Sequence, residues 1–110
     1  MMSDAALGLL GLGAKAGTIL IGTGSVRAEL QRNRVRAVVV ACDLSDRTAD
    51  KVVRLASAKG IPVVEGPTAA ELGRRLGRGA VQAVGVTDRR LAEGLLTKLG
   101  RRTVGGLSGD

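Results

Sequence analysis

The segment that most constrains the fold is a run of β-branched and small apolar residues in the middle of the chain. Residues 36 to 42 read RAVVVAC, with three consecutive valines at the centre. A strand with one face in water alternates apolar and polar residues, whereas a nearly continuous apolar run is typical of a strand covered on both faces. We therefore expect a strand from Arg36 to Cys42 with layers of structure on both of its sides.

Helical and extended patterns alternate along the rest of the chain. Further strands are expected over residues 18–21, 61–64 and 81–86, and helices are expected to begin near residues 4, 24, 46, 69 and 88. A strand, a helix and a second strand in this order favour a parallel unit. The pattern predicts an α/β fold, a three-layer α/β/α sandwich around a small mixed sheet of about four strands.

Polar residues that can cap a helix precede each helical pattern, and asparagine or glycine follows several of them. The expected N-caps are Ser3 or Asp4, Thr23, Ser45 or Asp46, Thr68, and Thr87 or Asp88. Thr68 and Glu71 have the spacing of a capping box. Asn33, Gly60 and Gly100 are expected to end the helices before them. The positions expected to face the sheet are Leu7, Leu10, Ala14, Val26, Leu30, Ala49, Val52, Val53, Ala56, Leu72, Leu76, Leu91, Leu95 and Leu99.

Length and hydropathy favour one soluble domain. The 110 residues are close to the usual size of a single domain, and no repeat or linker divides them. We expect the domain to occupy residues 1–100, and residues 101–110 to form a flexible C-terminal tail. No apolar run approaches the roughly 18 residues of a membrane span, and the first 17 residues do not resemble a signal peptide. A cytoplasmic location is therefore expected.

The charge of the chain favours an anionic partner. It holds 17 Lys and Arg against 10 Asp and Glu, a net charge of +7, and 13 of the 17 basic residues are arginine. Arginine pairs bidentately with phosphate and with guanine edges. The alternative is that arginine is simply the ordinary surface residue of this chain, and charge alone does not decide between the two interpretations.

Missing residue types exclude several kinds of chemistry. With no histidine and one cysteine, the chain lacks the commonest general base and cannot build a zinc cluster from the usual ligands. Cys42 is expected to be a buried structural thiol. Without Phe, Tyr or Trp, the stacking platforms of single-strand binders are also missing. A nucleic acid would have to be bound through backbone amides, short polar groups, arginine and shape. No metal or cofactor is expected.

Two glycine-rich stretches suggest nucleotide binding, and neither fits it. In GLLGLGAKAG, residues 8 to 17, Lys15 lies within a helical pattern, whereas a P-loop needs Gly-Lys-Ser/Thr between a strand and a helix. Close packing of the helix explains these glycines better. In GTGSVRA, residues 22 to 28, Arg27 stands at the third glycine position of a dinucleotide fingerprint, and Leu44 stands where an acid is required.

The second stretch still opens a helix, and the N-terminus of a helix is an anion site. The amides of residues 24–26 are expected to be free there. Arg27, Gln31 and Arg34 follow on one face of the helix. An ordinary solvated face explains these side chains as well as contact with RNA does.

Three blocks of the sequence resemble a known family. They are LLGLGAKAGTILIG (residues 9–22), AVVVACDLS (residues 37–45) and ELGRRLGRGAVQAVGVTD (residues 71–88). In order and spacing they resemble the kink-turn-binding ribosomal protein L7Ae superfamily, most closely its bacterial YlxQ-type branch, from Leu9 to about Leu99. The resemblance implies an α/β/α sandwich whose usual ligand is a kinked RNA helix with sheared G·A pairs.

The resemblance places the RNA-reading element at the turn into the second helix, where the family typically has Gly-x-Asn-Glu-x-x-Lys. Gly22 matches the family glycine. The Asn, Glu and Lys positions hold Gly24, Ser25 and Ala28. Loss of the carboxylate and of the cation removes about 1–3 kcal/mol of base discrimination each. Arg27 is one residue before the lysine position and points about 100° away around the helix, so it can reach phosphate without replacing the lost contact.

The resemblance adds further matches. Arg32 aligns with a basic residue common at that family position, and Asp43 with the acid after the central strand. The second RNA-facing element of the family is the loop before the last strand, here residues 78–81. Archaeal members carry a more apolar loop, and Arg78 makes this one more cationic.

Together these features predict a small, non-catalytic RNA-binding protein, ribosomal-protein-like, that binds structured RNA of kink-turn type with reduced base specificity. Its expected partner is ribosomal or similar structured RNA, with ribosome association, and neither a membrane nor a small-molecule substrate is expected. The candidate RNA-binding residues are Gly22, Thr23, Gly24, Ser25, Arg27, Ala28, Arg32, Arg78, Gly79, Ala80 and Val81.

The sequence leaves two other functions open. The residues at the three base-reading positions favour, as the alternative, a scaffold that has lost kink-turn recognition and acts through protein–protein interaction. An enzyme that uses Asp43, Asp46 and Asp50 has less support, because these acids follow a strand and open a helix, where capping and the helix dipole explain them.

Overall fold

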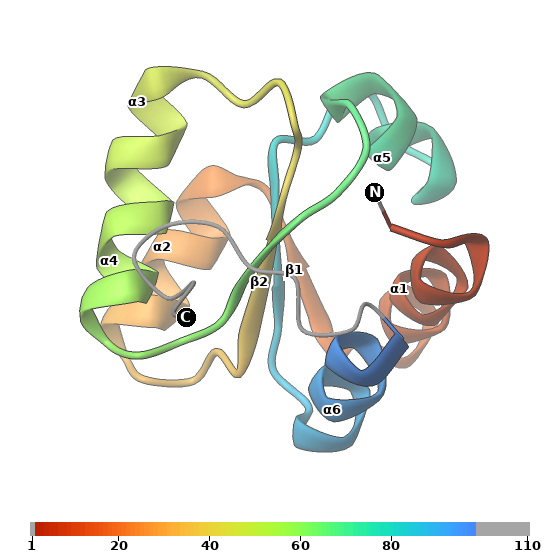
Figure 1. Ribbon diagram of the computed structural model, residues 1–110, viewed down its shortest axis with the longest axis horizontal. Coiled ribbons are helices and arrows are strands. Elements are labelled where there is room, and N and C mark those ends of the chain that lie inside the picture. The colour runs from red at the N-terminus through yellow and green to blue at the C-terminus, as the bar shows by residue number, and fades with distance from the viewer. Residues whose placement is uncertain (1, 99–110) are drawn as a thin grey trace.

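In the computed structural model, which describes residues 2–98, helices and strands alternate as the sequence predicts (Figure 1). In chain order the elements are α1 (Asp4–Ala16), β1 (Ile19–Ile21), α2 (Thr23–Gln31), β2 (Ala37–Val40), α3 (Asp46–Thr48), the π-helical segment η1 (Ala49–Val53), α4 (Arg54–Ala58), β3 (Val63–Glu65), α5 (Ala69–Arg75), β4 (Ala83–Val86) and α6 (Arg89–Lys98). Because α3, η1 and α4 follow one another without a break, they correspond to the single helix predicted from residue 46 to 59. The strands are shorter than predicted by one to three residues.

The sheet has the strand order β1-β4-β2-β3. β2 and β3 are parallel, with Val38 opposite Val63. β4 is antiparallel to both β1 and β2. The predicted parallel unit and the mixed sheet of four strands are both confirmed.

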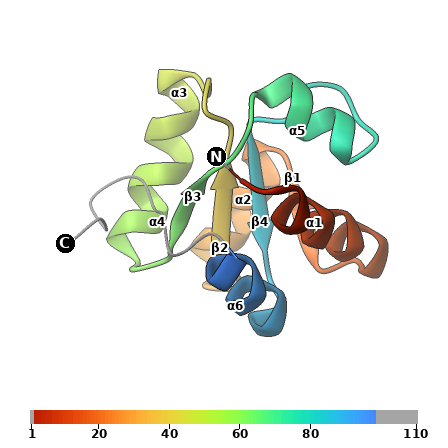
Figure 2. The ribbon, with the colours of Figure 1, turned by 45° about the vertical axis from the view of Figure 1, so that its right-hand side comes forward.

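Helices cover both faces of the sheet. α2 and the helix formed by α3 and α4 lie on one face, and α1, α5 and α6 lie on the other (Figures 1 and 2). All four residues of β2 are buried, and they alternate between two apolar clusters. Val38 and Val40 belong to the cluster with α2 and α4, whereas Ala37 and Val39 belong to the cluster with α1 and α6. The covered central strand and the three-layer sandwich are therefore as predicted.

Polar side chains cap four helices at expected positions. The cap oxygens are Ser3 Oγ, Ser45 Oγ, Thr68 Oγ1 and Asp88 Oδ1, which accept hydrogen bonds of 3.0–3.2 Å from amides three residues later. Asn33 and Gly60 adopt the left-handed conformation, with φ of 59° and 71°, where the helices before them end. Leu99, Gly100 and the predicted tail lie outside the described residues.

The apolar helix faces point inward as predicted. The buried positions are Leu7, Leu10, Val26, Leu30, Val52, Ala56, Leu72 and Leu95, and the half-buried ones are Ala14, Ala49, Val53, Leu76 and Leu91. Among residues 2–98 the structure contains no helix with the length and apolar character that a membrane crossing requires.

One half of the predicted capping box is formed at α5. Thr68 Oγ1 accepts from the Glu71 amide at 3.2 Å. The Glu71 carboxylate accepts instead from Arg74, from Nε at 2.9 Å and from Nη2 at 2.6 Å. This hydrogen bonding by Arg74 holds the pKa of Glu71 below its ordinary value.

The prediction of a buried thiol at Cys42 is wrong. β2 ends at Val40, two residues earlier than expected, and Cys42 is exposed. Its N–H donates to the carbonyl oxygen of Pro67 at 3.0 Å. The side chain is exposed because the residue lies in the turn that leaves the sheet.

Close packing explains only one of three glycines inside α1. A Cβ on Gly13 would lie 2.6 Å from Leu91 Cδ2 and 2.8 Å from Ile19 Cγ2. Nothing lies within 4 Å of the corresponding position on Gly8 or Gly11. The packing interpretation holds for Gly13 and is wrong for Gly8 and Gly11, which line a hollow at the surface instead.

Candidate nucleic-acid interface

The turn from β1 into α2 is tied to the first residue of β4. Gly22 donates its N–H to the carbonyl oxygen of Ala83 at 2.9 Å. Its φ of 107° is rarely adopted by residues with a side chain, so the turn requires glycine there. Gly22 is also the N-cap of α2, and no side chain caps this helix. The prediction that Thr23 is the cap is wrong, because Thr23 is the first helical residue.

The first turn of α2 presents three amides that have no acceptor within the helix. The first hydrogen bond of the helix runs from the Val26 N–H to the Gly22 oxygen at 3.0 Å. The free amides therefore belong to Thr23, Gly24 and Ser25, one residue earlier than predicted. Gly24 and Ser25 are exposed, and no acidic side chain lies in this turn. The positive end of the helix dipole is thus open to an anion.

The loop before β4 is held against the backbone of α5. The Arg78 N–H donates to the Gly73 oxygen at 2.8 Å, and the Val81 N–H donates to the Ala69 oxygen at 2.9 Å. A Cβ on Gly73 would overlap the carbonyl oxygen of Gly79. Sequence reasoning missed this role of Gly73, and the only signal was a glycine inside a helical pattern next to a glycine-rich loop.

These two segments line one hollow of about 420 Å³, called here the α2 hollow. Its lining consists of residues 21–23, at the turn from β1 into α2, and residues 78–82 of the loop before β4. Two segments that are far apart in the sequence, each a candidate for RNA contact, thus meet at one place. Arg78 is exposed there, whereas the Val81 side chain is only 6% exposed and belongs to the core.

The other candidate residues lie outside the α2 hollow. Gly24, Arg27 and Ala28 are exposed along α2. Arg32 lies at the opposite end of this helix, about 15 Å from the turn at 1.5 Å per residue. There Arg32 Nη1 lies 3.3 Å from Glu29 Oε2 in an ion pair. Arg32 is therefore not brought together with the turn.

The acids considered for catalysis have structural positions. Asp43 Oδ1 accepts from the Ala69 amide at 2.8 Å and so ties the turn after β2 to the start of α5. Asp46 lies in the first turn of α3, and Asp50 pairs with Arg54 at 3.7 Å. Within residues 2–98, no three His, Cys, Asp or Glu side chains are grouped so that they could hold a metal ion.

The sequence matches the model of the Ribosomal protein L7Ae/L30e/S12e/Gadd45 family over residues 4–95. The chain belongs to this family. It is also 33% identical over 91 residues to the RNA-binding protein YlxQ of Bacillus subtilis strain 168. That alignment covers 83% of this chain and 91% of the relative. The family resemblance seen in the sequence is confirmed.

Two solved structures share the architecture. A protein of unknown function from Bacillus halodurans C superimposes with a TM-score of 0.83 at 28% identity, covering 89% of this chain and 99% of its own. The Giardia lamblia 15.5kD RNA binding protein superimposes with a TM-score of 0.71 at 19% identity, covering 92% of this chain and 90% of its own. The second likeness concerns the fold alone, and it agrees with the predicted L7Ae-like sandwich.

Proposed function

We propose that this L7Ae-family member is a small, non-catalytic protein that binds structured RNA of kink-turn type with reduced base specificity. The α2 hollow carries the proposal, because it joins the start of α2 to an exposed arginine. The YlxQ relative is an RNA-binding protein, and this likeness and the net charge of +7 support an RNA partner.

The binding mode follows from the chemistry of this surface. Phosphate oxygens accept hydrogen bonds from the free amides of residues 23–25, and the helix dipole favours the negative charge. Arg78 pairs with a neighbouring phosphate from the other side of the hollow. These contacts position an RNA backbone but do not distinguish one base from another.

Base reading is weak because of the side chains at the start of α2. The family pattern has Asn, Glu and Lys where this chain has Gly24, Ser25 and Ala28. None of these three can donate from an amide side chain, accept through a carboxylate or supply a cation. Recognition through phosphates remains, so ribosomal or other structured RNA in the cytoplasm is the proposed partner, with association to the ribosome.

A binding series with the variant Arg78→Ala tests this surface. If Arg78 contacts one phosphate, the slope of log K against log salt concentration becomes shallower by about 0.9 unit. Arg90→Ala is the matched control, since Arg90 is exposed in the first turn of α6 and does not line the α2 hollow. Equal slopes for the two variants would contradict the proposed contact.

A second comparison addresses base specificity. We expect nearly equal affinity for a kink-turn RNA and for the same RNA without its G·A pairs. No binding to either RNA at low salt would overturn the proposal. That result would favour the scaffold function suggested by Gly24, Ser25 and Ala28. A pull-down should then retain a protein partner after nuclease treatment.

A further inference from the structure

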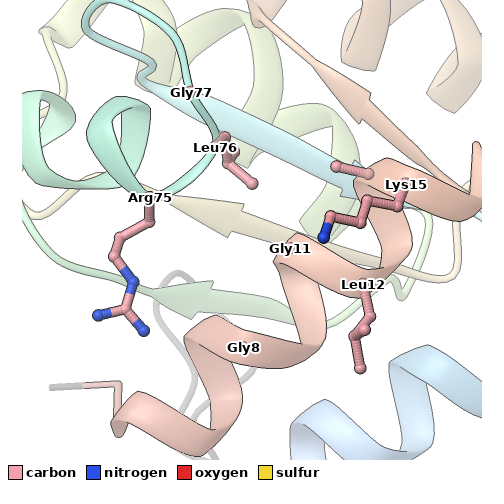
Figure 3. Close-up of a pocket in the computed structure, with 8 residues that line it drawn as sticks. Gly8, Gly11, Leu12, Lys15, Arg75, Leu76 and Gly77 are labelled. Carbon is pink, nitrogen blue, oxygen red and sulfur yellow. The ribbon is translucent and has the colours of Figure 1, made fainter.

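The α2 hollow is one end of a longer groove. A second hollow of about 560 Å³ follows β1, and it shares Ile21 and Arg78 with the α2 hollow. A third, of about 460 Å³, lies between α1 and α5 and shares Ala14, Lys15 and Leu76 with the second (Figure 3). The three hollows, called here the groove, therefore adjoin one another from the start of α2 to the outer side of α1.

The groove is basic throughout. Its lining contains Lys15, Arg75 and Arg78 and no Asp or Glu. Lys15 and Arg78 are exposed, and neither forms an ion pair within residues 2–98. Arg75 is paired with Asp4 at 3.3 Å, so Lys15 and Arg78 are the cations available to a ligand. This charge is complementary to a polyanion.

Apolar side chains lie between these cations. Ile19, Ile21 and Leu76 line the middle of the groove, and β1 is an edge strand of the sheet. Leu12, 64% exposed, is on the third hollow, where Gly8 and Gly11 leave the surface of α1 open. Leu76 and Lys15 point toward one another across the gap between α5 and α1 (Figure 3).

Apolar side chains bordered by cations fit an unpaired RNA strand better than a duplex. Bases in a duplex are stacked and paired, whereas those of a single strand are free to contact side chains while their phosphates reach basic groups. In this chain, which has no aromatic residue, aliphatic side chains take the place of aromatic stacking platforms. Each hollow is within the roughly 300–1,000 Å³ of ordinary ligand sites, which suits single nucleotides. The observations therefore favour a single strand as the occupant.

We propose that an unpaired strand flanking the structured RNA continues from the α2 turn along this groove, with Lys15 of α1 as its phosphate contact. Lys15 shares the middle hollow with Ser25 and Arg78. It thus places a cation beside the first turn of α2. This helix has Ala28 where the family pattern has a lysine. This inference rests on the proposed function and extends it from the kinked core to the flanking strand.

The test compares three RNAs that share one kink-turn core. One has no extension, and the others carry about six unpaired uridines at the 5′ or the 3′ end, within the usual site size of single-strand binders. We expect one of the extensions to increase affinity for the wild-type chain. In Lys15→Ala the gain in affinity from the extension is expected to be about fivefold smaller at 0.1 M salt. This factor corresponds to a slope of about 0.7 unit per single-strand phosphate over one decade of salt concentration.

Lys59→Ala is the matched control because it removes the same charge at the end of α4, away from the groove. It is expected to bind all three RNAs with equal small losses. A second pair of variants, Gly11→Glu and Gly11→Gln, probes the third hollow without a clash, since nothing lies within 4 Å of a Cβ at Gly11. The carboxylate should reduce the gain from the extension through repulsion, and the neutral amide should not.

The outcomes separate the two proposals. If the core RNA binds but neither extension increases affinity, or if Lys15→Ala and Lys59→Ala behave alike, the groove does not hold a flanking strand and the proposed function stands. If no RNA binds, the proposed function fails and this inference with it. An extension effect lost in Lys15→Ala and Gly11→Glu, and retained in both controls, supports the groove.

Discussion

The three glycines inside α1 have different roles, which shows that the role of a glycine depends on what a side chain at its position would meet. Gly13 faces Leu91 and Ile19, so its lack of a Cβ allows α1 to approach its neighbours. Gly8 and Gly11 face open space at the groove. A helical pattern cannot distinguish these cases, because contacts to α6 and β1 decide them.

The variants Gly8→Ala and Gly13→Ala test this difference. Gly8→Ala is expected to raise the free energy of unfolding by about 0.5–1 kcal/mol, because alanine loses less backbone entropy in a helix. Gly13→Ala is expected to lower it by about 1–3 kcal/mol through overpacking against Leu91 and Ile19. Urea unfolding followed by circular dichroism measures both, since the chain has no aromatic residue for fluorescence. Equal effects of the two variants would show that the contacts of Gly13 relax freely.

At the scale of elements, the sequence predicts most of the fold. β-branched runs, helical periodicity and caps are local signals, and they identify every α-helix and strand and the covered position of β2, but not the π-helical segment η1. The exact ends are less well predicted, because tertiary hydrogen bonds set them. Because Gly22 is hydrogen-bonded to Ala83, α2 begins one residue earlier than predicted, and the free amides also lie one residue earlier.

The candidate site is predicted less completely than the fold. The resemblance identifies the α2 turn and the loop before β4, but not their relation to α1. Lys15 and Leu76 enter the groove only because α1 and α5 lie next to one another on the same face of the sheet (Figure 2). Arg32 is the opposite case, since its position matches the family in sequence but lies at the far end of the helix and is paired with Glu29. Its contact with RNA stays a prediction.

The first turn of α2 permits a direct test of base reading. The triple variant Gly24→Asn, Ser25→Glu and Ala28→Lys restores the family pattern at three exposed positions. We expect its preference for a kink-turn RNA over the same RNA without G·A pairs to increase by about 1–3 kcal/mol for each restored contact. Competition binding measures the ratio of affinities, and circular dichroism controls for the fold. An unchanged ratio would mean that the turn is not where bases are read.

For the whole molecule, the sheet is the structure that joins two separate apolar layers. Val38 and Val39 are adjacent in β2 and fully buried, yet Val38 faces the cluster with α2 and α4 and Val39 faces the cluster with α1 and α6. The groove is built on α1, α2, α5 and β1, so it draws on both layers. Loss of either layer should therefore unfold the other and remove the site.

The variants Val38→Ala and Val39→Ala test this coupling. Each removes two buried methyl groups, which costs about 2 kcal/mol from transfer at 0.8 kcal/mol per group and from the cavity left behind. Because the two side chains point to opposite faces of the sheet and belong to separate clusters, the double variant should lose about the sum of the two effects although the residues are adjacent. Since one sheet carries both layers, all three variants should unfold in a single transition with an unchanged denaturant slope. A second transition in either single variant would show that its layer unfolds independently, and the groove would then be expected to lose RNA affinity before the chain unfolds completely.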